Sequence, residues 1–233
     1  MNDILVFTAT YNEKENIEDL ITKITNLSDK ISIFVIDDNS PDGTGKILEE
    51  ISKNKKNFDF FIREKKLGLN TAHTMAYKYA LDNNFSKLIT LDADLSHDIN
   101  EIPKILELLN SYDFVIGSRY MPGGKNDMKG FRLLLSIYGN KLIKFLLNSK
   151  GTEFTSSFRG FNLRNLKNFH LNQIKSRGYS FFMETVIKLE MMGFKIFEIP
   201  IYFRDRKYGV SKIPKFEIFR TLKNLVFLFF KKN

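Results

Sequence analysis

The sequence contains no cysteine. Disulfides and thiolate metal sites are therefore excluded, and any metal must be held by oxygen or imidazole ligands. There is also no run of about 18 apolar residues, so we expect no transmembrane helix. The first residues lack a basic region followed by an apolar core, which argues against a signal peptide. Together these absences predict a protein that acts in the cytoplasm.

The net charge of the 233-residue chain is +9. An anionic membrane face, a phosphate-bearing substrate or nucleic acid could account for this excess, and so could a general enrichment in Lys and Asn. The basic residues are not interleaved with aromatic residues in a recognisable nucleic-acid module. We therefore expect no nucleic-acid partner, and the first two partners stay open.

Short apolar runs alternate with helical patterns through the first half of the chain. The expected strands are residues 4–7, 31–36, 58–62, 88–91 and 114–117, and the expected helices between them are residues 13–27, 44–51, 72–81 and 102–109. This alternation predicts an α/β fold, a Rossmann-like and mainly parallel sheet flanked by helices. In such sheets ligands bind beyond the carboxyl ends of the strands.

The alternation stops after Arg119. Residues 120–160 are basic, contain glycine and are predicted to be less regular, and a helix over 182–192 and a strand over 196–203 follow. Residues 216–230 are amphipathic to strongly apolar and precede two lysines. The stretch is too short to span a bilayer but suits a helix in the membrane interface. A helix packed on the core and a helix that binds a membrane-protein partner are the alternatives.

Two carboxylates, Asp92 and Asp94, follow the fourth expected strand with one residue between them. Such a pair can approach one hard cation, or one carboxylate can bind the metal while the other holds a ribose hydroxyl. Mg²⁺ and Mn²⁺ prefer oxygen ligands and often bridge carboxylates to substrate phosphates. Alone the pattern is weak, because a solvated turn has the same residues.

Three further polar clusters follow neighbouring strands. Thr10 to Glu13 follows the first, where the Tyr11 ring could stack on a nucleobase or where Asn12 and Glu15 could simply cap a helix. Asp37 and Asp38 follow the second and suit contacts to a base or ribose, or an ordinary turn. Arg63 and the segment 65–69 follow the third and open a helix, which favours anions.

These residues carry a family resemblance. The motifs are Thr10-Tyr11-Asn12-Glu13, Asp37 to Thr44, Gly68-Leu69, Leu91 to His97, Gly117 to Tyr120, Gly123-Gly124, Arg132 to Asn140, Thr155 to Arg159, Gly178-Tyr179, Glu198 to Ile201 and Arg206 to Lys212. Their order resembles the family-2 inverting glycosyltransferases of GT-A fold, and more narrowly the dolichol- and polyprenol-phosphate mannosyltransferases. The resemblance covers residues 3–213.

The chain departs from the family pattern at three places. Ala9 replaces the usual Pro, and Glu153 to Arg159 stands where Asp-x-x-Ser-Gly-Phe-Arg is commoner, so a Gly is lost. Ser96 stands where some members have a Gln metal ligand. Whether Ser96 or His97 completes the metal site therefore stays open.

The resemblance implies a role for each matching position. The residues expected to bind the nucleotide sugar are Thr10, Tyr11, Glu13, Asp37, Asp38, Arg63, Asp92 and Lys212. Those expected to bind the acceptor phosphate are Arg119, Arg132, Ser136 and Arg206. The metal, Mg²⁺ or Mn²⁺, falls on Asp92 and Asp94. Asp94 and the three arginines are the residues expected to be catalytic.

The expected activity is an inverting transfer of a hexose, mannose from GDP-mannose, to a polyprenyl or dolichyl phosphate. A lipid monophosphate is already an anionic nucleophile and needs cationic positioning rather than a strong base. The alternatives are a UDP-sugar donor or a glycan hydroxyl acceptor in surface polysaccharide synthesis, and a non-catalytic membrane-associated scaffold. Residues 1–213 would form the catalytic domain and 214–233 a helix that holds the enzyme peripherally at the cytoplasmic face of the membrane.

Overall fold

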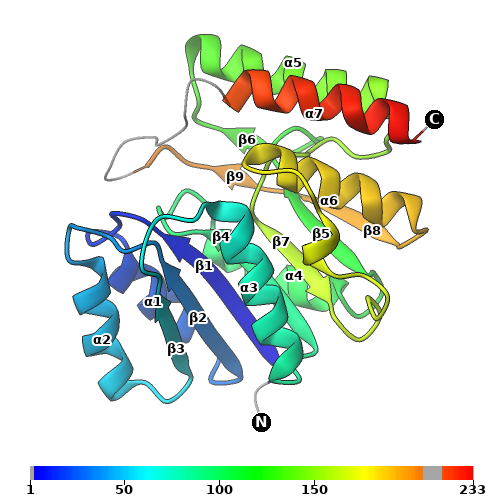
Figure 1. Ribbon diagram of the computed structural model, residues 1–233. Helices are drawn as coiled ribbons and strands as arrows, with labels where there is room; N and C mark the ends of the chain where they lie inside the picture. The colour runs from blue at the N-terminus through cyan, green and yellow to red at the C-terminus, as the bar shows by residue number, and fades with distance from the viewer. Residues whose placement is uncertain (1–2, 207–216, 233) are drawn as a thin grey trace.

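The computed structural model describes residues 3–206 and 217–232. Its centre is a seven-stranded sheet with the order β3-β2-β1-β4-β7-β5-β8 (Figure 1). The strands are β1 (Ile4–Thr10), β2 (Ile31–Asp37), β3 (Phe58–Ile62), β4 (Lys87–Asp92), β5 (Phe114–Ser118), β7 (Arg159–Asn162) and β8 (Ile196–Pro200). Strand β7 runs antiparallel to both of its neighbours, and the other pairings in this sheet are parallel. The predicted mainly parallel sheet is confirmed.

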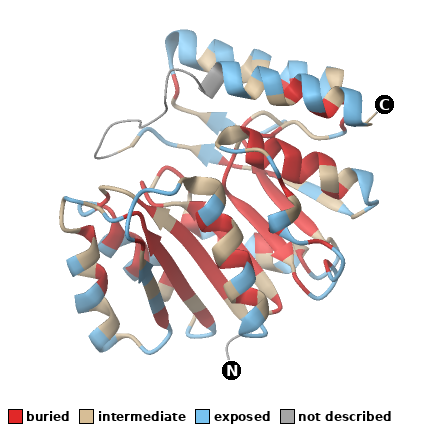
Figure 2. Cartoon of the chain, in the orientation of Figure 1, coloured by how far each residue is buried: buried red, intermediate tan, exposed pale blue. Residues whose placement is uncertain are grey.

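Helices cover both faces of the sheet. One core joins the sheet to α1 (Ile17–Thr25), α2 (Thr44–Asn54) and α4 (Ile102–Leu108), and the other joins it to α3 (Leu69–Asp82) and α6 (Tyr179–Met191). Along β1, Leu5 and Phe7 enter the second core while Val6 enters the first. Side chains alternate between the two faces of a strand, so a strand covered on both faces is apolar throughout. Figure 2 shows the burial concentrated in these strands and in α6. Short 3₁₀ helices η1 (Ile99–Glu101) and η2 (Leu171–Gln173) complete the layers.

A long helix, α5 (Gly130–Leu146), occupies part of the segment that was predicted to be less regular, so that prediction was wrong. The prediction failed because α5 is mostly exposed, and within it only Asn140 and Ile143 are buried. Phe131 and Phe145, at opposite ends, are 77% and 80% exposed. Apolar residues on the exposed side remove the polar face from which an amphipathic helix is recognised in a sequence.

The last element, α7 (Glu217–Lys232), confirms the predicted C-terminal helix and packs on α6. Leu225 and Leu228 are buried in the core that contains α6. In Figure 1, α7 lies beside α5 above the rest of the fold, and Lys232 Nζ donates a hydrogen bond to the Leu147 carbonyl just beyond α5. Within the described ranges, no helix is both long enough and apolar enough to cross a membrane. The short strands β6 (Lys125–Asn126) and β9 (Tyr202–Phe203) pair with each other in a second, two-stranded sheet.

Helix α4 and Leu109, the residue after it, pack closely against Gly160 in β7. A methyl group at this position would lie 2.5 Å from Ile105 Cγ2 and 3.0 Å from Leu109 Cδ1. We expect Gly160→Ala to lower the free energy of unfolding by about 1–3 kcal/mol, because the branched Ile105 side chain cannot yield without moving α4.

The matched control is Gly139→Ala in α5, where a methyl group would have no atom within 4 Å. We expect it to be neutral or to stabilise the protein by up to about 1 kcal/mol through helix propensity. Urea denaturation of both variants measures the difference. Equal midpoints would show that α4 is not in tight contact with β7.

Candidate active site

Three neighbouring strands end in polar residues at one edge of the sheet. In the parallel register Thr10 pairs with Asp37, and Ala9 pairs with Asp92 on its other side. Strands β1, β2 and β4 therefore deliver their terminal residues to a common position, as expected for the ligand-binding edge of a parallel sheet.

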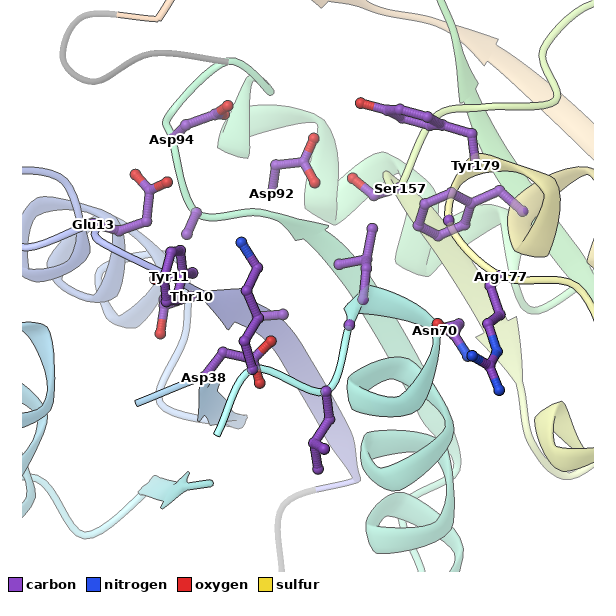
Figure 3. Close-up of a pocket in the computed structure, with 18 of the residues that line it drawn as sticks. Thr10, Tyr11, Glu13, Asp38, Asn70, Asp92, Asp94, Ser157, Arg177 and Tyr179 are labelled. Carbon is purple, nitrogen blue, oxygen red and sulfur yellow. The ribbon is translucent and has the colours of Figure 1, made fainter. Parts of the chain in front are cut away.

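A cavity of about 520 Å³, here called cavity A, opens at this edge (Figure 3). The volume is within the range of small-molecule sites. Its charged lining residues are the acidic Glu13, Asp38, Asp92 and Asp94 and the basic Lys66, Arg177, Arg206 and Arg220. Thr10 and Tyr11 also line it. Figure 3 shows Asp92 at the end of β4 and Asp94 in the loop that follows, with Ser157 next to Asp92 and Tyr179 beyond it.

One end of cavity A has the chemistry of a nucleoside site. The Lys66 ammonium lies 3.8 Å from the centre of the Tyr11 ring, and Asp38 on the same wall forms an ion pair with the buried Arg63. Glu13 accepts a hydrogen bond from the Asn16 side chain at 2.8 Å. An aromatic face beside a carboxylate offers both stacking and hydrogen-bond acceptance to a base.

Two of the predicted contact residues, Asp37 and Arg63, do not line the cavity. Asp37 is buried and accepts hydrogen bonds from the Thr10 hydroxyl at 2.8 Å and from the backbone and hydroxyl of Ser40. Arg63 pairs with Asp38 and donates a hydrogen bond to Thr71 Oγ1 at 2.6 Å. Both side chains hold the walls of the cavity in place.

Each carboxylate of the acidic pair has its own partners. Asp92 Oδ2 lies 3.3 Å from His97 Nε2. Asp94 Oδ1 accepts hydrogen bonds from the Ser96 backbone at 3.1 Å and from its hydroxyl, and Asp94 Oδ2 lies 2.8 Å from Arg206 Nε. Ser96 and His97, the two residues considered as third metal ligands, therefore orient the carboxylates in this structure.

Asp92 is ionised in this setting. Burial disfavours its charged form, but hydrogen bonds from His97 and Ser157 and the charge of Arg206 outweigh burial and hold the pKa of Asp92 well below its usual range. Its side chain keeps 35% of its surface exposed. Asp92 thus presents a carboxylate, rather than a carboxylic acid, to the cavity at neutral pH.

A second cavity of about 230 Å³, here called cavity B, lies between α5 and the first turns of α7. All four residues predicted to bind an acceptor phosphate line it: Arg119, Arg132, Ser136 and Arg206. Its other walls are largely apolar, with Leu135, Ile143, Phe203 and Leu222 among them. Asp92, Thr155, Tyr179 and Arg206 line both cavities, so A and B meet at these residues.

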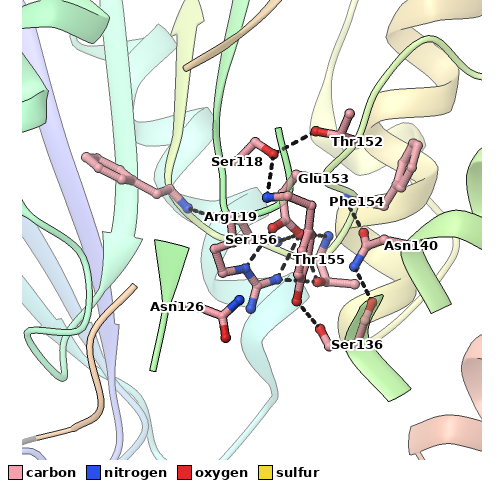
Figure 4. Close-up of polar contacts among 12 residues, drawn as sticks. Ser118, Arg119, Asn126, Ser136, Asn140, Thr152, Glu153, Phe154, Thr155 and Ser156 are labelled. Atoms are coloured by element: carbon pink, nitrogen blue, oxygen red, sulfur yellow. Dashed lines mark hydrogen bonds and ion pairs between the residues drawn. The ribbon is translucent and has the colours of Figure 1, made fainter. Parts of the chain in front are cut away.

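Arg119 is fixed by a buried ion pair (Figure 4). Its Nε and one terminal nitrogen lie 2.7 and 2.8 Å from the two carboxylate oxygens of Glu153, and it also donates to Thr155 Oγ1 at 2.8 Å. Glu153 is fully buried. Burial opposes the charge of Arg119, but the pairing with Glu153 raises its pKa above the usual value, so the guanidinium is permanently charged and geometrically fixed.

Sequence reasoning missed several lining residues. Arg177, Tyr179 and Arg220 line cavity A, and Thr155 lies between the cavities. The Gly178-Tyr179 and Thr155 to Arg159 motifs signalled two of these positions. Arg177 lies in a segment with no local pattern, and the pattern around Arg220 predicted a C-terminal helix but no place in the site. Lys212, predicted to lie near the phosphates, is outside the described residues.

Comparison with known proteins identifies relatives over most of the chain. The model of glycosyl transferase family 2 matches residues 5–169. A polyprenol monophosphomannose synthase from Mycolicibacterium smegmatis is 33% identical over 212 residues, which are 90% of this chain and 80% of the relative. An undecaprenyl-phosphate mannosyltransferase from Micrococcus luteus is 30% identical over 211 residues, which are 90% of this chain and 87% of that protein.

Solved structures share the fold at lower sequence identity. A glucosyl-3-phosphoglycerate synthase from Mycobacterium tuberculosis, in complex with Mn²⁺, uridine diphosphate and glucosyl-3-phosphoglycerate, superposes with a TM-score of 0.66 at 15% identity, covering 99% of this chain and 80% of that one. A mannosyltransferase from Pyrobaculum calidifontis in complex with GDP-mannose and Mn²⁺ gives 0.62 at 18% identity, covering 96% and 62%. These likenesses confirm the predicted GT-A architecture.

The buried Arg119–Glu153 pair is expected to be costly to break. Glu153→Gln should lower the free energy of unfolding by about 3–5 kcal/mol, since the variant leaves the Arg119 charge buried without a counter-ion. The control Glu190→Gln removes a carboxylate that bonds only the Ser149 hydroxyl and the Lys150 backbone among the described residues, and should cost about 1 kcal/mol.

The same substitution should change the pH dependence. Burial disfavours ionisation of Glu153, but Arg119 and Thr155 together hold its pKa below the usual value. Its stabilisation is therefore present above about pH 4.3 and is lost as the pH falls through the folded-state pKa. Urea denaturation across this acid range should show a larger loss of stability for the wild type than for Glu153→Gln, and parallel curves would contradict the pairing.

Proposed function

Because the chain belongs to glycosyl transferase family 2, we propose that it transfers mannose from GDP-mannose to a polyprenyl or dolichyl phosphate with inversion at the anomeric carbon. The observation that carries this proposal is the junction of the two cavities. Cavity A, with an aromatic ring, carboxylates and basic side chains suited to a nucleotide sugar, meets the arginine-lined and otherwise largely apolar cavity B at Asp92, Thr155, Tyr179 and Arg206. The names of the two bacterial relatives support the sugar and the lipid class.

The acidic pair fits a divalent cation, Mg²⁺ or Mn²⁺. Asp92 and Asp94 offer carboxylate oxygens at the wall of cavity A, and among the described residues no group of three His, Asp or Glu side chains forms a complete protein cage. One or two carboxylates with substrate phosphates and water is the usual Mg²⁺ arrangement. When bound, the cation offsets the negative charge that grows on the leaving diphosphate.

The basic residues of cavity B suit an anionic nucleophile. Arg119 is held rigidly by Glu153, and Arg132 has no ion-pair partner within the described part of the chain. A planar guanidinium binds phosphate through two hydrogen bonds. An oxygen of the lipid phosphate would bond to the anomeric carbon as the bond from that carbon to the diphosphate oxygen breaks, and the nucleoside diphosphate leaves with the electron pair.

A glycan hydroxyl acceptor fits less well. It would need a general base near the anomeric carbon. Among the described lining residues of cavity B the one carboxylate is Asp92, whose depressed pKa makes it a weak base. A non-catalytic scaffold is disfavoured by the intact acidic pair and its organised partners.

The proposal extends to a membrane surface. Six large apolar side chains of α5 and five of α7 are exposed: Phe131, Leu134, Leu135, Tyr138, Leu142 and Phe145, and Phe219, Leu222, Val226, Phe227 and Phe230. The two helices together carry seven Lys and Arg residues and one Glu. Apolar side chains among lysines suit the interface of an anionic bilayer, and cavity B opens between the same helices. We propose that the enzyme works peripherally at the cytoplasmic face, where nucleotide sugars are available.

The activity is tested by incubating the protein with GDP-mannose, UDP-glucose or UDP-N-acetylglucosamine, a polyprenyl phosphate and Mn²⁺ or Mg²⁺, and detecting the glycolipid by mass. We expect a mannolipid from GDP-mannose. Asp94→Asn should lower turnover about 100-fold or more, since several kcal/mol of charge stabilisation would be lost.

The control is Asp98→Asn in the same loop, because Asp98 pairs with Arg204 and lines neither cavity. It should keep turnover within about two-fold, as expected of a surface ion pair. No glycolipid from any donor, or full turnover by Asp94→Asn, would overturn the proposed reaction.

Membrane docking is tested by flotation with vesicles that contain anionic phospholipid. The double variant Phe227→Ser and Phe230→Ser should bind about ten-fold more weakly or worse, because two apolar side chains no longer enter the interface. Phe61→Ser is the matched control, since Phe61 is an exposed phenylalanine of β3, outside the two helices. Equal loss in both variants, or equal binding to neutral vesicles, would contradict the proposed surface.

A further inference from the structure

Arg206 occupies the junction of the two cavities in an unexpected pairing. The family resemblance implies a contact to the acceptor phosphate in cavity B, yet its Nε lies 2.8 Å from Oδ2 of Asp94, a residue expected to bind the metal. The Arg206 side chain is 25% exposed and the Asp94 side chain 3%. The contact therefore joins a half-buried cation to an almost fully buried carboxylate.

Both carboxylate oxygens of Asp94 already have partners in this arrangement. Oδ1 accepts two hydrogen bonds from Ser96, and Oδ2 faces Arg206. A cation that approaches Oδ2 therefore competes with the guanidinium for the same oxygen.

Two other carboxylates of cavity A have ion-pair partners of their own. Asp38 is paired with Arg63, and Asp92 with His97. For Asp94, Arg206 is the basic residue in ion-pair contact among the described residues. A buried carboxylate without a counter-ion is strongly unfavourable, so Arg206 stays on Asp94 until another cation replaces it.

We propose that Arg206 is an exchangeable counter-ion. In the resting enzyme it neutralises Asp94, and when a divalent cation occupies that carboxylate Arg206 is released toward the phosphate of the acceptor in cavity B, which it also lines. This inference rests on the proposed function for the identity of the second anion. Arg206 thereby couples the two cavities, because a cation that binds Asp94 in cavity A frees the Arg206 guanidinium to bind phosphate in cavity B.

The first test measures Mn²⁺ binding by electron paramagnetic resonance, with neither nucleotide nor acceptor present. Arg206→Gln should bind Mn²⁺ about ten-fold more tightly than the wild type, because affinity is reduced by the fraction of molecules in which the guanidinium blocks the site. A residue that merely contacts the acceptor phosphate would leave Mn²⁺ affinity unchanged.

Three variants provide controls. Arg206→Lys keeps a positive charge and should stay close to the wild type, and Arg204→Gln removes a nearby arginine that pairs with Asp98 outside the cavities and should not change Mn²⁺ affinity. Adding Arg206→Gln to Asp94→Asn should produce no tightening, since the competing carboxylate is gone.

Equal Mn²⁺ affinity in wild type and Arg206→Gln, weaker binding in the variant, or binding too weak to measure in both would overturn the proposal. The outcome is separate from that of the reaction, because glycolipid synthesis by the wild type is scored independently. A wild type that makes mannolipid with no Mn²⁺ tightening in Arg206→Gln would refute the exchange and leave the function standing.

Discussion

The buried carboxylate of Glu153 fastens the acceptor side of the molecule to the sheet. It receives Arg119 from the end of β5 and the backbone N–H groups of Thr155 and Ser156. A second carboxylate, Glu198 of β8, accepts the N–H groups of Thr152 and Glu153 at 2.8 and 2.9 Å. Glu198 thus holds the start of the loop before β7 and Glu153 holds its following residues. Thr155 of this loop lies at the boundary between the cavities. This anchor therefore fixes the part of the wall that the two cavities share at Thr155.

The charges of the site are arranged so that few are left without a partner. Asp38, Asp92, Asp94 and Glu153 each contact a basic residue or histidine. Among the arginines of cavity B, the exposed Arg132 is the one without an ion-pair partner in the described part of the chain. The phosphates of a nucleotide sugar and of an anionic acceptor bring further negative charge into this site, and that charge needs positive partners. A bound divalent cation adds positive charge, and Arg206, once released from Asp94, provides the charge of its guanidinium.

The sequence predicted the half of the fold that follows simple periodicity. Strands buried on both faces are continuous apolar runs, and their polar ends meet because the strands are parallel, so Thr10, Asp92 and their neighbours could be expected in one place. Helix α5 could not, because its apolar residues are exposed rather than buried. The supporting roles of Asp37 and Arg63 were equally hidden, since residue type does not tell whether a side chain faces the cavity or its wall.

Helix α7 links the membrane proposal to the chemistry of the site. Its inner residues Leu225 and Leu228 are buried against the core, so the helix is part of the folded domain. Its first turns place Arg220 on cavity A and Thr221 and Leu222 on cavity B, while its outer face exposes phenylalanines. The expected division between a catalytic domain and a C-terminal helix at residue 213 therefore puts the first turns of α7, which line both cavities, in a different part from the rest of the site. The surface that would meet a lipid acceptor and the surface that would align its phosphate are two sides of one helix.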